Sequence, residues 1–95
     1  MGTPATLEED VVDVLDIQSP LALRNLPPAE RASTQLNMSN GFDKAAKIVL
    51  AVTLGNIAAR YGNGHARLIR SSESLALGTV ADAVDLTARA AAGQP

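Results

Sequence analysis

The chain has 95 residues, which is enough for one domain and leaves little room for a second. It contains no cysteine and one histidine, His65, so disulfides, thiolate metal sites and two-histidine metal sites are excluded, and we expect no metal and no cofactor. The formal net charge is −2, and with only one Phe and one Tyr the core must be built from Leu, Ile, Val and Ala.

No targeting segment is visible, because the N-terminus lacks the basic region and the apolar stretch of a signal peptide. The longest apolar run, residues 48–59, contains Thr53, Gly55 and Asn56 and is too short to span a bilayer. We therefore expect a cytoplasmic protein without a membrane partner.

The first predicted helix covers about residues 7–16. Thr6 and Glu9 have the spacing of a capping box, and acidic side chains at the start suit the positive end of the helix dipole. Apolar residues then follow at helical spacing, namely Leu7, Val11, Val14 and Leu15.

Prolines mark the connector that follows. Pro20 and the pair 27–28 interrupt the chain, and Pro28 suits the first turn of a short second helix that we expect to reach about Leu36. The polar stretch 37–41 then breaks the pattern.

The longest predicted helix runs from Phe42 to about Tyr61, with Asn40 as its cap. Apolar and small residues occur around much of its circumference, which is typical of a helix buried at the centre of a domain. Gly62 and Gly64 end it, and we expect one of these two glycines at positive φ.

A last helix is predicted over about Ser74–Ala92, with a break left open at Gly78, and residues 93–95 are expected to fray. The whole pattern predicts an all-α fold, a small bundle of about four helices in a single domain over 1–95. Residues 1–41 supply the N-terminal helices and connector, and residues 42–92 a helix–loop–helix core. Because a core poor in aromatic residues gains burial by association, we expect a homodimer formed through Leu, Val and Ala of the last two helices.

The charges are unevenly distributed along the chain. Acidic residues crowd the first segment, and no basic residue precedes Arg24. From residue 44 to residue 70 every charged side chain is basic, namely Lys44, Lys47, Arg60, Arg67 and Arg70. The ordinary explanation for both groups of charges is that they lie on solvated helix faces. The more specific explanation is that the basic residues at the centre of the chain bind an anion, next to an acidic N-terminal segment.

The segment from Arg60 to His65 is the one part of the chain that looks like a site. Helix capping alone can explain its residue types, since Arg, His and Gly are all favoured near a helix C-terminus. Phosphodiester cleavage explains them as well, because it needs a group that titrates near neutral pH and a fixed cation, which His65 and Arg60 supply. The candidate substrate-binding residues are Tyr61, Asn63, Arg67 and Arg70.

A long helix ending in R-x4–6-H and followed by another helix resembles the HEPN superfamily of small all-α domains. Many of these domains are metal-independent ribonucleases of toxin–antitoxin and abortive-infection systems. Residues 54–67 are most similar to the abortive-infection C-terminal domain, whose motif is close to R-N-x-x-G-x-G-H-G, and residues 83–88 loosely follow its later A-V-x-x-A-x-x-L pattern. The resemblance covers about residues 42–92. It implies an endoribonuclease with RNA as substrate, Arg60 and His65 as catalytic residues, and a homodimer in which two such loops face each other.

One departure from the family pattern leaves two alternatives open. Aligned on His65 and the two glycines, the family's Arg-Asn pair falls on Ala58 and Ala59. Either Arg60 is the motif arginine with the shortest allowed spacing, or the pair is lost and the chain is an inactivated form without its transition-state cation.

A second function, of another class, fits the acidic first helix and the Ala-rich packing. This is a non-catalytic helical interaction module, such as an antitoxin-like partner or a phage structural or adaptor protein. A nucleic-acid-binding repressor is less well supported, because no helix-turn-helix pattern appears.

Overall fold

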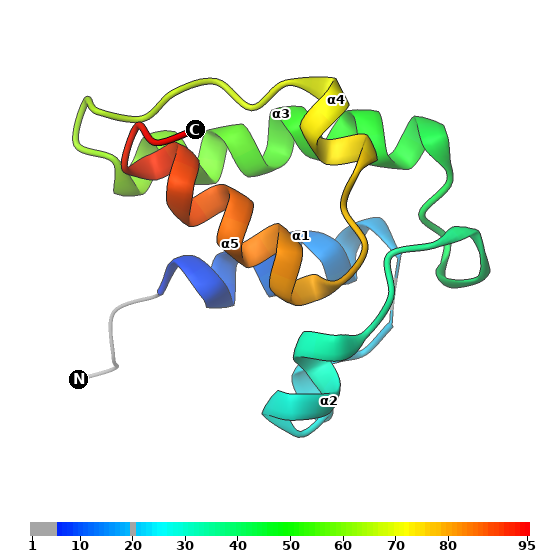
Figure 1. The fold of residues 1–95 in the computed structure, drawn as a ribbon. Coiled ribbons are helices and arrows are strands. Elements are labelled where there is room, and N and C mark those ends of the chain that lie inside the picture. The colour runs from blue at the N-terminus through cyan, green and yellow to red at the C-terminus, as the bar shows by residue number, and fades with distance from the viewer. Residues whose placement is uncertain (1–5, 20) are drawn as a thin grey trace.

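The computed structural model describes residues 6–19 and 21–95 (Figure 1). Over these ranges the chain forms helices and one isolated bridge but no strand, which confirms the all-α prediction. The described residues contain five α-helices rather than about four. They are α1 (Leu7–Gln18), α2 (Pro28–Ser33), α3 (Lys44–Tyr61), α4 (Ser71–Leu75) and α5 (Val80–Ala91), with the short 3-10 helices η1 (Leu23–Asn25) and η2 (Met38–Asn40).

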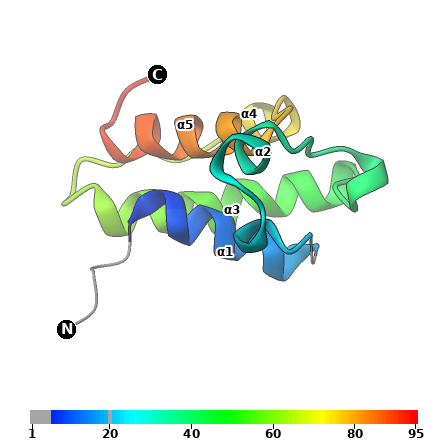
Figure 2. The same ribbon diagram turned by 90° about the horizontal axis from the view of Figure 1, so that it is seen from below.

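Three long helices build the core, because α1, α3 and α5 each contact the other two. Figure 2 shows them side by side. As predicted, the core is almost wholly aliphatic, and each fully buried Leu, Ile or Phe contributes roughly 1.5–3 kcal/mol by leaving water. The side chains at its centre include Val11, Leu15, Leu50, Leu54, Ile57, Ala83, Leu86 and Ala90, closed by Leu23, Leu36 and Phe42 from the connectors.

The caps of the first two long helices follow local side-chain chemistry. The hydroxyl of Thr6 accepts a hydrogen bond from the backbone N–H of Glu9 at 3.1 Å, as predicted, and α1 runs on to Gln18. The predicted cap of α3 was wrong. Asp43, not Asn40, accepts from the first turn of α3, and Asn40 instead ends η2. This happens because the side chain of Phe42 turns into the core before the helix begins.

One pairing between distant segments shortens α2 and divides the predicted last helix. The N–H of Leu36 donates to the carbonyl of Gly78 at 2.9 Å, and the N–H of Val80 donates to the carbonyl of Thr34 at 3.0 Å. The chain is therefore extended at both places. As a result α2 ends at residue 33 rather than near residue 36. The helix break that the sequence left undecided at Gly78 is present, and it separates α4 from α5. Pro20 lies outside the described residues.

The two faces of α3 differ in burial. Its inner face carries Leu50 and Leu54, which are fully buried. On its outer face Ile48, Val49 and Val52 are 42%, 50% and 65% exposed, so the expected central helix is covered on one side only in the single chain. None of the helices in the described part of the chain is long and apolar enough to cross a membrane.

Candidate functional site

The segment that carries the candidate site is a tight turn at the end of α3. The helix ends at Tyr61, as predicted, and the N–H of His65 donates to the carbonyl of Gly62 at 2.9 Å. Between these two residues Asn63 has φ 49° and Gly64 has φ 86°, the sign pattern of a type I′ turn. The prediction of a glycine at positive φ is confirmed at Gly64, whereas Gly62 has φ −88°. We call residues 62–65 the Gly62–His65 turn.

The backbone of this turn is packed against the end of α5, which lies next to it in Figure 1. A Cβ added at Gly62 would lie 2.7 Å from the carbonyl oxygen of Ala91, and one added at Gly93 would lie 2.6 Å from that of His65. Both contacts are too short for any other residue, so glycine is needed for the approach. The side chain of His65 is nevertheless exposed. The turn therefore presents an exposed imidazole from a fixed backbone.

Arg60 precedes the turn and contacts a carboxylate of α1. Its Nη2 lies 3.6 Å from Oδ2 of Asp10, and the Arg60 side chain stays 63% exposed, against 17% for Asp10. The hydroxyl of Tyr61 donates to the same oxygen at 2.6 Å. This hydrogen bond is the main reason why the pKa of Tyr61 is raised above its ordinary value. Sequence reasoning missed Asp10, and the acidic crowding in the first helix was its only signal.

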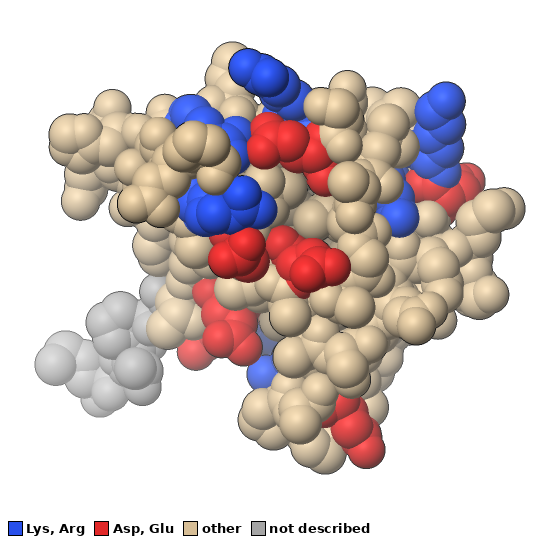
Figure 3. All heavy atoms as spheres, viewed as in Figure 1, with Lys and Arg blue, Asp and Glu red and all other residues tan. Residues whose placement is uncertain are grey.

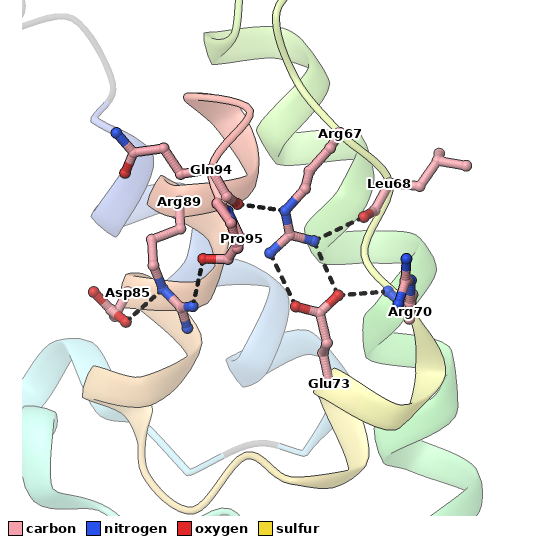
Figure 4. A network of polar contacts seen from close by, with 8 residues as sticks. All are labelled: Arg67, Leu68, Arg70, Glu73, Asp85, Arg89, Gln94 and Pro95. Atoms are coloured by element: carbon pink, nitrogen blue, oxygen red, sulfur yellow. Dashed lines mark hydrogen bonds and ion pairs between the residues drawn. The ribbon is translucent and has the colours of Figure 1, made fainter.

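Arg67 follows the turn and is engaged within the chain (Figure 4). Its two terminal nitrogens donate to the two oxygens of Glu73, both at 2.9 Å, and its Nε donates to the carbonyl of Gln94. The hydrogen bonds from Arg67 lower the pKa of Glu73. Arg89 holds the carbonyl of Pro95 at 2.9 Å. The tail, which is expected to fray, lies outside α5 and is exposed, and two arginines donate hydrogen bonds to its backbone carbonyls.

The remaining candidate residues lie at the surface. Asn63 is exposed at the tip of the turn, and Arg70 is exposed just before α4. The region does not form one basic surface, because Arg67 and Arg89 are paired with Glu73 and with Asp85. Figure 3 shows this mixture, with acidic side chains lying among the basic ones on that face. Of the three arginines that follow α3, Arg70 is the most exposed, and it lies at the start of α4 rather than in the turn.

Burial distinguishes positions 58 and 60, the two places at which the motif arginine could stand. The Ala58 side chain is 0% exposed and belongs to the core, whereas Ala59 and Arg60 are exposed. Positions 58 and 60 point roughly 200° apart around a helix axis. A side chain at position 58 points into the core, and of these two positions only 60 lies at the surface of this chain.

Comparison of the chain with protein-family models, with curated proteins and with solved structures gave no match. Within the described residues, no group of three or more His, Cys, Asp or Glu side chains is placed to hold a metal ion. Function is therefore inferred from the residues and the geometry of the turn.

Proposed function

We propose that the chain is a HEPN-type, metal-independent endoribonuclease of the kind found in toxin–antitoxin and abortive-infection systems. His65 moves a proton of the 2′-hydroxyl or of the leaving oxygen, and Arg60 stabilises the negative charge that develops on the phosphate. The supporting observation is the Gly62–His65 turn, whose backbone is fixed by α5 while both functional side chains remain exposed. A site needs such a fixed frame with accessible side chains.

The burial of Ala58 supports the alternative in which Arg60 is the motif arginine, with the spacing R-x4-H. Asn63 and Arg70 are the accessible candidates for contacts to the RNA, because Tyr61 and Arg67 already bind carboxylates of the chain. A contact between Arg70 and a phosphate would add affinity without sequence preference.

A second copy of the chain completes the proposed site. One histidine cannot serve as acid and base at the same moment, and each chain contributes only His65. The outer face of α3 supports association, because the large apolar side chains of Ile48, Val49 and Val52 are exposed close together on it. In a homodimer, part of this face would be withdrawn from water.

The test is RNA cleavage by the purified chain in excess EDTA. We expect the wild-type chain to cut RNA and to slow growth when expressed, and the His65→Ala variant to lose cleavage while keeping its helical circular dichroism. Arg24→Ala is the matched control, because Arg24 is an exposed arginine far from the turn in sequence and paired only with Asp13 in the described residues. A well-folded wild-type chain that cuts no RNA at high micromolar concentration would overturn the proposal.

The exposed apolar side chains on the outer face of α3 also favour a second candidate, the non-catalytic interaction module that binds another protein. Val52→Lys separates the two functions, because it places a charge in the middle of this face. For the ribonuclease we expect this variant to sediment as a monomer and to lose cleavage. For the interaction module we expect no cleavage by either form, and loss of a protein partner by the variant.

A further inference from the structure

Three side chains from two helices meet at the end of α3. Oδ2 of Asp10, on α1, accepts the hydroxyl of Tyr61 at 2.6 Å and lies 3.6 Å from Nη2 of Arg60. We call these three residues the Asp10 cluster. It joins a helix outside the motif-bearing part of the sequence to the residue that carries the proposed cation.

Asp10 itself is held firmly. Its side chain is 17% exposed, and the next residue, Val11, is fully buried in the core. The Tyr61 hydroxyl donates to the oxygen that faces Arg60, so it fixes the position of that oxygen. A fixed carboxylate of this kind restrains a cation at a defined place.

Arg60, by contrast, is mostly in solvent and has a long, flexible side chain. Within the described residues its guanidinium makes this one contact, through a single nitrogen, so the other donors of the group face no protein acceptor. A free arginine loses rotamer freedom when it binds a phosphate, and a restraint applied beforehand removes part of that loss. At 3.6 Å the contact is longer than a hydrogen bond, so the carboxylate attracts the guanidinium while its N–H groups stay available to a phosphate.

We propose that Asp10 is a positioning residue of the RNA-cleaving site, which holds the Arg60 guanidinium at the end of α3 while Tyr61 holds Asp10. This role rests on the proposed function, since it concerns the cation of that reaction. It also gives α1 a part in the site. A carboxylate that competed with the phosphate for Arg60 would have the opposite effect on the rate.

Kinetics distinguishes the two effects. We expect Asp10→Asn, which keeps the shape of the side chain, to lower kcat about 10- to 100-fold with a smaller change in KM, because a misplaced group costs transition-state stabilisation. Asp13→Asn is the matched control. It removes the same charge from the same helix, where Asp13 pairs with exposed Arg24, and we expect an unchanged rate. Asp10→Glu should restore part of the activity. A faster Asp10→Asn variant would overturn the proposal.

Two measurements follow the cluster without RNA. Tyr61 is the only tyrosine and the chain has no tryptophan, so absorbance of the phenolate reports this residue alone. We expect Asp10→Asn, but not Asp13→Asn, to move the pKa of Tyr61 back toward 10.0. We also expect the NMR signal of the Arg60 Nε–H group to report a more mobile side chain in Asp10→Asn.

These measurements separate the two proposals. A folded wild-type chain that cuts no RNA overturns the proposed function, and the positioning role of Asp10 in that reaction with it. An active wild-type chain in which Asp10→Asn leaves both the mobility of Arg60 and kcat unchanged overturns the positioning role alone.

Discussion

Arg60 precedes the Gly62–His65 turn in the sequence and Arg67 follows it, and the two arginines contact carboxylates in different ways. Arg67 meets both oxygens of Glu73 at 2.9 Å and is 24% exposed, whereas Arg60 meets one oxygen of Asp10 at 3.6 Å and is 63% exposed. Two-point, half-buried contacts fix geometry, and a loose exposed contact leaves most of the guanidinium accessible. Two arginines of one basic segment can thus serve structure on one side and a ligand on the other.

This comparison depends on the exposed position of Arg60, so the largest expected effect comes from placing an arginine at the buried position 58 instead. Ala58→Arg should lower the free energy of unfolding by about 3 kcal/mol or more, because it forces a charged, oversized side chain into the core. Ala59→Arg is the matched control on the exposed neighbour and should change stability by no more than about 0.5 kcal/mol. Urea denaturation measures both. If Ala58→Arg were stable and more active than the wild type, the motif arginine would belong at 58.

The next effect is on catalysis. Arg60→Ala should reduce RNA cleavage about 100-fold or more, since the developing charge on the phosphate loses its cation. The melting temperature should move by no more than about 2 °C, because an exposed side chain with one loose contact adds little to stability. Parallel cleavage assays and thermal melts check this. Arg60→Lys keeps the charge and should recover part of the rate. If Arg67→Ala lost as much cleavage as Arg60→Ala without losing stability, the assigned roles would be exchanged.

On the other side of the turn the expected effect is on structure. Arg67→Ala should destabilise the fold by about 1–3 kcal/mol, because the hydrogen bonds to a charged partner and to the tail are lost. The backbone amides of Gly93 and Gln94 should then exchange hydrogen faster. Arg24→Ala, at an exposed pair, should stay within about 0.5 kcal/mol of the wild type. Equal losses of stability in the two variants would remove the structural distinction drawn for Arg67.

The parts of this molecule that could be predicted from sequence depend on neighbours along the chain. The Thr6 cap, the end of α3 at Tyr61 and the positive φ of Gly64 each follow from residues within one helical turn. The mistakes depend on distant contacts. Residues 34–36 pair with residues 78–80, and this contact stops α2 early and divides the last helix.

The candidate site divides in the same way. Its turn was predictable because glycine and asparagine favour positive φ locally. The Asp10 contact was not, because it joins α1 to the far end of α3. The contact of Arg67 with the carbonyl of Gln94 was not predictable either, because composition alone does not show which side chain reaches the tail.

The smallest expected effect is a pH dependence on the Arg67 side. Arg67 holds the pKa of Glu73 below its ordinary 4.5 in the folded chain. Because the folded-state pKa is the lower one, the folded chain binds this proton less readily than the unfolded chain. The carboxylate therefore contributes stability above about pH 4.5, and this contribution is lost as the pH falls through the folded-state value. Urea denaturation at a series of pH values should show that Glu73→Gln is less stable than the wild type at neutral pH. The two chains should converge in acid. If the free energies of unfolding of Glu73→Gln and the wild type differed by the same amount at every pH, the contact between Arg67 and Glu73 would contribute no charge-dependent stability. Shape alone would then explain how Arg67 packs against α4.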